Sequence, residues 1–309
     1  MNCLLPPSSF DTHVHVFDPS ITPYAPDRAY TPDDAPLSNL LTFNANLSHQ
    51  DPKSTLVLVQ PSPYKTDNTV LLRCLAELHR QGRRAYGIAV IDIHSITDAE
   101  LAVMHRLGVR GIRLNFQADG RDVDVARLGM VLHQAAERIR DLPGWMIQLF
   151  VPEWVWDELF ESILTLPVPI IADHMGGMLG SSKLPPTLKD RPQSQSGFNS
   201  LIRLAKLRKV IIKISGLYRA STQTETCYDD TRPIIQTFAK EIPEMCIWGS
   251  DWPHTGEGKK RAQNKDLSVK EPFRVVDNVA ILENLRGWVG ENVWVKIMRE
   301  NPKRIFEDL

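Results

Sequence analysis

The sequence contains 309 residues, 42% of them hydrophobic and 24% charged, and its 36 Lys and Arg oppose 37 Asp and Glu to give a net charge of −1. Because acidic and basic residues are interspersed along the chain, the sequence has no long basic stripe that could bind nucleic acid. The four cysteines are too scattered for a disulfide scaffold, and no run of about eighteen apolar residues is present that could cross a membrane. We therefore expect a globular protein of the cytoplasm, with no nucleic-acid partner and no membrane partner.

The first predicted element is a strand at residues 10–17, with the sequence Phe-Asp-Thr-His-Val-His-Val-Phe. Alternate side chains of a strand point to the same face, so His13 and His15 leave that face together. Two converging imidazoles suit a metal site or a pair of hydrogen-bond donors for an oxyanion. One packed and one exposed histidine would fit the same pattern, so this strand alone leaves the choice open.

A proline-rich stretch, residues 19–36, comes next and is not expected to form regular secondary structure. We expect it to lie as an extended arm along the rim of an active site. Tyr30 on this arm is a candidate substrate contact, and packing within the arm is the alternative role for its ring.

From residue 55 onward, apolar runs alternate with amphipathic segments. Strands are predicted at residues 55–60, 85–91, 111–116, 145–151, 168–174, 210–215 and 245–250. Helices are predicted at residues 70–78, 97–107, 123–140, 153–165 and 197–207, and Thr97 and Glu100 have capping-box spacing. With the first strand, this alternation predicts a (β/α)8 TIM barrel, with a single domain at residues 1–309 and the barrel at about 10–306.

An open doubly wound sheet is the alternative fold. Such a sheet usually has a glycine-rich phosphate-binding turn after its first strand, where this sequence has His-x-His. In the barrel, three loops, at about residues 19–36, 175–196 and 254–272, are expected to cap the carboxyl ends of the strands, where barrels of this kind have their active sites.

Polar side chains stand at the carboxyl end of seven predicted strands. They are His13 and His15, Gln60 with Ser62, Arg113 and Asn115, Gln148, Asp173 and His174, Ser215 with Tyr218 and Arg219, and Ser250 and Asp251. Any one of them could be a turn residue or a helix cap. Because these ends meet around one mouth in a barrel, their joint occurrence indicates an active site.

Six motifs in order resemble the amidohydrolase superfamily, from about residue 10 to residue 306. They are Asp-Thr-His-Val-His-Val-Phe at 11–17, Gly-Ile-Arg-Leu-Asn-Phe at 111–116, Ala-Asp-His-Met-Gly-Gly at 172–177, Lys-Ile-Ser-Gly-Leu-Tyr-Arg at 213–219, Trp-Gly-Ser-Asp-Trp-Pro-His at 248–254, and Asn-Pro-Lys-Arg-Ile-Phe at 301–306. Within the superfamily, the chain most resembles the amidohydrolase-related branch of 2-pyrone-4,6-dicarboxylate lactonase and the sugar-lactone and muconolactone hydrolases.

The resemblance implies that four residues are catalytic, namely His13, His15, His174 and Asp251. Arg113 and Gln148 stand where two-metal members of the superfamily have ligands, and neither side chain suits a transition metal, so a two-metal site is excluded. A single zinc or other divalent ion held by the same four residues remains open. We expect no metal, as in the dicarboxylate lactonases, because arginines crowd the site.

The resemblance further implies a hydrolase that opens a carboxylate-bearing lactone, in the catabolism of aromatic compounds or sugar lactones. Asp251 would activate water, and the three histidines would donate hydrogen bonds to the developing oxyanion. Arg113 and Arg219 would grip the substrate carboxylate. The expected secondary contacts are Gln60, Ser62, Gln148, Tyr30 and Tyr218.

Several alternatives stay open at this stage. A mononuclear zinc decarboxylase of the same superfamily would use the same four catalytic positions, and a barrel that only binds a small anion would keep the fold without activity. The arginine that helps the pyrone-dicarboxylate lactonases hold a second carboxylate has no clear match near Arg121, so a monocarboxylate lactone is also considered. A homodimer is not excluded.

Overall fold

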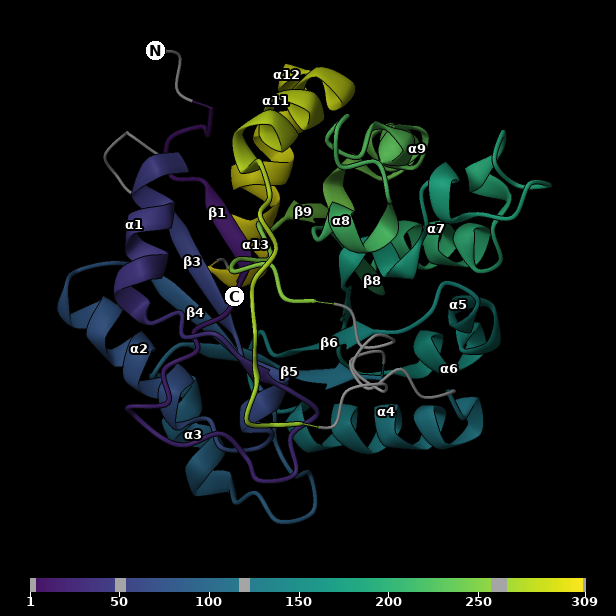
Figure 1. The fold of residues 1–309 in the computed structure, drawn as a ribbon. Helices are drawn as coiled ribbons and strands as arrows, with labels where there is room; N and C mark the ends of the chain where they lie inside the picture. Colours follow the sequence, from purple (N-terminus) through teal and green to yellow (C-terminus); the bar gives the residue numbers. More distant parts are fainter. Residues whose placement is uncertain (1–3, 48–53, 117–122, 257–265, 308–309) are drawn as a thin grey trace.

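The computed structural model describes residues 4–47, 54–116, 123–256 and 266–307. Within these ranges, eight parallel strands form one sheet in which pairing follows chain order. The strands are β1 (Phe10–Val14), β3 (Thr55–Val59), β4 (Ala85–Ala89), β5 (Val109–Asn115), β6 (Met146–Phe150), β7 (Ile170–Ala172), β8 (Val210–Ile214) and β9 (Cys246–Trp248). Figure 1 shows helices around these strands, and the expected (β/α)8 architecture is confirmed.

The last strand returns to the first and nearly closes the barrel. Just beyond the end of β9, Asp251 N donates to His13 O of β1 at 2.9 Å, and His15 N donates to Trp252 O at 2.9 Å. Gly249 allows this approach, because a Cβ atom there would lie only 2.6 Å from Cβ of His13. Closure therefore places the start and the end of the barrel side by side.

Helices connect the strands on the outside. They are α1 (Leu37–Leu47), α2 (Thr69–Arg80), α3 (Asp98–Arg106), α4 (Val125–Ile139), α5 (Val155–Glu158), α6 (Phe160–Thr165), α7 (Phe198–Lys206), α8 (Leu217–Ala220), α9 (Arg232–Glu241), α11 (Asn278–Val289), α12 (Glu291–Val295) and α13 (Asn301–Phe306). The expected capping box is present, since Glu100 N donates to Thr97 Oγ1 at 3.2 Å and Thr97 N donates to Glu100 Oε2 at 2.8 Å. The helix expected at 153–165 is divided at Leu159 into α5 and α6.

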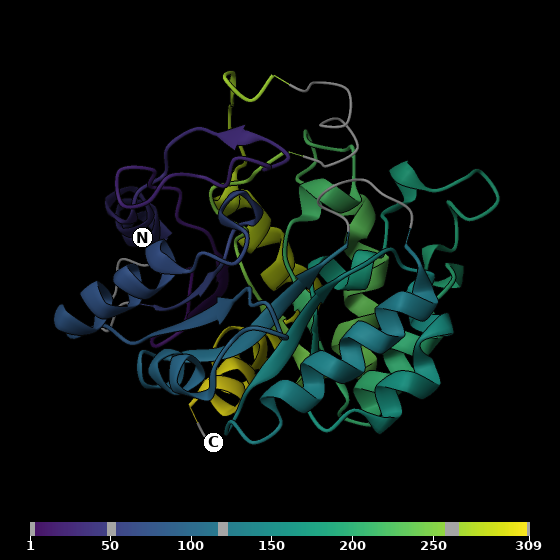
Figure 2. The ribbon, with the colours of Figure 1, turned by 90° about the horizontal axis from the view of Figure 1, so that it is seen from below.

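The proline-rich arm is irregular apart from the two-residue strand β2 (Thr31–Pro32), which pairs in parallel with β10 (Lys270–Glu271). Arg28 Nη2 also donates to Leu267 O at 3.1 Å. Figure 2 shows both segments at the same end of the barrel. The arm and the segment before α11 therefore cap one end together, although residues 257–265 of the expected loop lie outside the described ranges.

The apolar core lies between the strands and the surrounding helices. Leu75 of α2, Leu132 of α4 and Leu201 of α7 are completely buried against the barrel. Among the residues that the structure describes, no helix is both long enough and apolar enough to span a membrane.

Candidate active site

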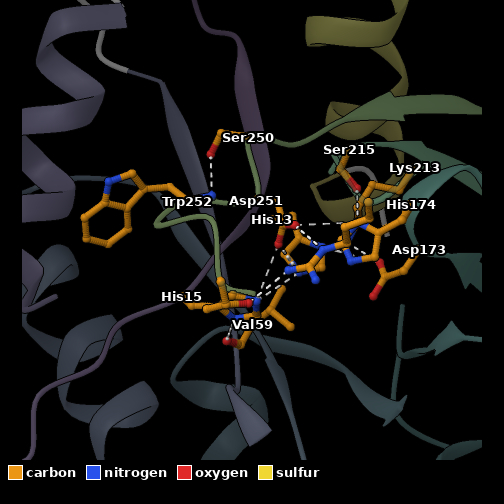
Figure 3. Close-up of polar contacts among 12 residues, drawn as sticks. His13, His15, Val59, Asp173, His174, Lys213, Ser215, Ser250, Asp251 and Trp252 are labelled. Carbon is orange, nitrogen blue, oxygen red and sulfur yellow. Dashed lines mark hydrogen bonds and ion pairs between the residues drawn. The ribbon is translucent and has the colours of Figure 1, made fainter. Parts of the chain in front are cut away.

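The four residues expected to be catalytic lie together at the carboxyl ends of the strands (Figure 3). Asp251 Oδ1 is 3.6 Å from His13 Nε2 and 3.8 Å from His15 Nε2. Asp251 Oδ2 is 3.9 Å from His174 Nδ1. All four side chains are buried, so the charge on Asp251 is not screened by bulk water.

Two of these residues have backbone conformations that side-chain-bearing residues rarely adopt. Asp251 has a φ of +61° and His174 has a φ of +49°, both in the left-handed region. Such a conformation costs on the order of 1–3 kcal/mol, and it persists only where the surrounding structure holds it. Gly216 makes room for both side chains, because a Cβ atom there would lie 2.7 Å from His174 Nδ1 and 2.9 Å from Asp251 Oδ2.

The two carboxylate oxygens of Asp251 have different surroundings. Oδ2 accepts hydrogen bonds from Tyr218 Oη at 2.7 Å and from Arg219 Nε at 2.8 Å. Oδ1 is buried and accepts no hydrogen bond from the described residues. Burial opposes ionisation, but the adjacent guanidinium of Arg219 outweighs it and holds the pKa of Asp251 well below its usual range. Asp251 is therefore an anion with one oxygen free to accept a proton.

The hydrogen bonds of His15 fix the position of its ring proton. Its Nδ1 lies 2.7 Å from the backbone oxygen of Val59, which can only accept, so Nδ1 carries the hydrogen and Nε2 of the neutral ring is bare. Burial lowers the pKa of His15 well below its usual value and lowers that of His174 to about 3. Both rings are therefore neutral at physiological pH.

A buried lysine that sequence reasoning did not select lies beside these histidines. Lys213 Nζ on β8 donates to Gln148 Oε1 at 2.6 Å and approaches Asp173 Oδ1 at 3.2 Å and His13 Nδ1 at 3.4 Å. Gln148 Nε2 in turn donates to Asp173 Oδ2 at 2.8 Å. The sequence signal was the single charge in the apolar run Val-Ile-Ile-Lys-Ile, since a lysine is rarely buried in a strand without a partner.

The guanidinium of Arg113 makes fewer hydrogen bonds with the described residues than the guanidinium of Arg219 does. Arg113 Nη1 donates to Gln60 O at 3.3 Å, whereas its buried Nε donates no hydrogen bond to the described residues and lies 3.9 Å from Asp173 Oδ2. By contrast, the guanidinium of Arg219 contacts Asp251, Tyr218, Thr255 and Gly256. The ring of Tyr30 is buried and interacts electrostatically with both arginines.

The remaining candidates lie at the edge of this cluster. The amide nitrogen of Gln60 donates hydrogen bonds to the backbone oxygens of Lys65 at 3.3 Å and Asp67 at 2.7 Å. Ser62 begins a short 3-10 turn, Ser62–Tyr64, and its hydroxyl makes no hydrogen bond with the described residues. Arg121 lies outside the described residues, so its relation to the site is not established.

Three donor atoms suit a single divalent cation. His13 Nε2 and His15 Nε2 are 3.2 Å apart, close to the separation of roughly 3.3 Å expected between two nitrogen ligands at about 2.05 Å from a tetrahedral zinc. Asp251 Oδ1, the buried oxygen without a hydrogen bond, faces both nitrogens. His174 belongs instead to a second group with His13 and Asp173, so the expected four-ligand set is divided between two groups.

Comparisons with known proteins agree with this arrangement. The chain is 31% identical over 313 residues to a 4-sulfomuconolactone hydrolase of Rhizobium radiobacter, covering 98% of this chain and 91% of that protein. It is 30% identical over 264 residues to a 2-pyrone-4,6-dicarboxylate hydrolase of Comamonas testosteroni, covering 81% and 78%. A solved structure from Pseudomonas putida, named for 2-pyrone-4,6-dicarboxylic acid hydrolase, matches with a TM-score of 0.72 at 27% identity and covers 97% of each chain. The amidohydrolase family model matches residues 10–307, and the chain belongs to the amidohydrolase family.

Proposed function

We propose that this protein hydrolyses a lactone that carries a carboxylate group. The observation that carries the proposal is the buried, ionised Asp251, whose Oδ1 accepts no hydrogen bond from the described residues and lies 3.6 Å from His13 Nε2 and 3.8 Å from His15 Nε2. The same site contains Arg113, whose buried Nε donates no hydrogen bond to the described residues. The names of both relatives, a sulfomuconolactone hydrolase and a pyrone-dicarboxylate hydrolase, support this activity over the decarboxylase alternative.

In the proposed reaction, Asp251 Oδ1 takes a proton from a water molecule as the water oxygen attacks the ester carbonyl of the lactone. The carbonyl oxygen becomes an oxyanion, to which His13 and His174, whose ring centroids lie 5.0 Å apart, would donate hydrogen bonds. When the ring C–O bond breaks, the proton passes from Asp251 to the departing oxygen. One lactone and one water thus become one open-chain acid with a new hydroxyl or enol group. Before substrate binds, the bare Nε2 of His15 accepts from Nε2–H of His13 and so orients this donor, which then turns to the oxyanion.

The two arginines have separate roles in this proposal. Arg113 would bind the substrate carboxylate through charge-assisted hydrogen bonds. Arg219 and Tyr218 would position Asp251, because both already donate to its Oδ2 atom. This assignment moves Arg219 from the substrate to the base.

We propose that turnover does not require a metal ion. Three cationic side chains, those of Arg113, Arg219 and Lys213, act on this cluster, and each would repel an added divalent cation. If an ion is bound, His13, His15 and Asp251 would hold it, and it would supply Lewis-acid polarisation of an oxygen.

The experiment is a ring-opening assay on lactones that bear two, one or no carboxylates, followed by NMR so that each product is identified. We expect kcat/KM to be at least about 100-fold higher for a carboxylate-bearing lactone than for its uncharged analogue, as charge-assisted hydrogen bonds to Arg113 would give. Equal rates on both would contradict the proposal, and so would no ring opening with any lactone.

A further inference from the structure

Lys213 has no part in the proposed reaction, yet it is fully buried in the barrel interior against the outer side of His13. Its ammonium group has three hydrogens and three polar neighbours, namely Gln148 Oε1, Asp173 Oδ1 and His13 Nδ1. Figure 3 shows Lys213 beside His13 and Asp173, on the side away from His15. An ammonium can only donate, so a hydrogen bond at this contact requires Nδ1 of His13 to accept.

From this geometry we infer that Lys213 is a positioning residue that fixes the proton of His13 on Nε2. With Nδ1 accepting from Lys213, the neutral ring must carry its hydrogen on Nε2, which lies 3.2 Å from the bare Nε2 of His15 and 3.6 Å from Asp251 Oδ1. The competing arrangement has Nδ1–H donating to Asp173 Oδ1 at 3.4 Å. It would leave two bare Nε2 atoms facing each other.

The two arrangements have opposite chemical consequences. A protonated Nε2 is a hydrogen-bond donor and cannot be a metal ligand, because ligation uses the lone pair of that nitrogen. This inference rests on the proposed function, in which Nε2–H of His13 is needed as a hydrogen-bond donor. It adds that Lys213 favours a hydrogen-bonding His-x-His pair over a metal-binding one. Gln148 supports the selection by binding Lys213 and Asp173 through the two ends of its amide.

The direct test is nitrogen NMR of the unaltered protein labelled at its histidines. His13 is assigned as the signals lost from the otherwise folded His13→Gln variant. We expect a protonated Nε2 and an unprotonated Nδ1 for His13, and the reverse for His15. A protonated Nδ1 on His13 would overturn the inference, and this measurement does not depend on whether a lysine variant folds.

The second test measures zinc affinity by competition with a coloured chelator. In Lys213→Met, the proton of His13 is free to move toward Asp173 and one repelling charge is removed, so we expect zinc to bind about 10- to 100-fold more tightly than to the parent. Lys209→Met is the matched control, because the ammonium of Lys209 donates to Leu166 O at 3.0 Å, away from the described site residues, and the zinc affinity of this variant should equal that of the parent. Unchanged affinity in a folded Lys213→Met protein would contradict the inference.

Neither readout involves a lactone. If no lactone is opened but the expected tautomer and zinc affinities are found, the proposed function fails and the role of Lys213 stands. If lactones are opened while His13 carries its proton on Nδ1, the proposed function stands and the inference fails.

Discussion

At the scale of single residues, the site depends on the unequal surroundings of the two oxygens of one carboxylate. Tyr218 and Arg219 occupy Oδ2 of Asp251, which fixes the orientation of the group and stabilises its charge. Oδ1 is left for a proton. Removing this charge is therefore expected to affect the reaction more than binding.

Asp251→Asn should lower kcat by about 100- to 10,000-fold with a much smaller change in KM. The asparagine has nearly the same shape and can still accept from Tyr218, but it cannot take a proton from water. Steady-state kinetics on the lactone that the parent opens would measure both constants. Turnover within threefold of the parent would show that Asp251 is not the base.

Arg113→Lys should raise KM by about 10- to 100-fold even though the charge is kept. An ammonium cannot form two parallel hydrogen bonds with a carboxylate, and one charge-assisted bond is worth about 1.5–3 kcal/mol. The same enzyme should show no loss on a carboxamide analogue of the substrate, which serves as the control. A loss of equal size on both substrates would mean that Arg113 does not hold the carboxylate.

At the scale of elements, much of the architecture could be predicted from sequence because its causes are local. The apolar runs near residues 55, 85, 111, 145, 168 and 210 form strands, because helices cover their outer face and the barrel interior buries their inner face. The sequence does not predict helix α1, because the proline-rich arm that ends at Pro36 hides where the helix starts. The segment at 153–165 looks like one continuous helix in the sequence, because Leu159, where it divides, has no capping side chain to mark the boundary.

Gly216 shows how an element sets the geometry of the site. It precedes α8 with a φ of +56°, and a methyl group there would overlap both His174 and Asp251. Gly216→Ala should lower the stability by about 1–3 kcal/mol and lower kcat at least about 10-fold. Thermal melts and kinetics would measure this, with Gly287→Ala as the control, because a Cβ at Gly287 has no neighbour within 4 Å among the described residues. A variant with native kinetics would show that this close approach is not needed.

At the scale of the whole molecule, closure of the barrel makes one site from distant parts of the chain. The convergence of His13, His174 and Asp251 could be predicted, because strand ends of a barrel meet at one mouth. The partners of each side chain could not. That Arg219 holds Asp251, and that Lys213 and Gln148 surround Asp173, depends on side-chain directions across several strands, and no local pattern carries that information.

In the proposed reaction, Asp251, rather than a metal ion, activates the water that opens a carboxylate-bearing lactone. The most direct measurement compares kcat/KM on such a lactone for protein stripped with a chelator, for the same protein with one equivalent of zinc, and for protein as purified, with zinc content determined in each sample. We predict equal activity in the stripped and untreated samples, and no gain on adding zinc. Activity that disappears with the metal and returns in proportion to bound zinc would contradict the account and make His13, His15 and Asp251 metal ligands.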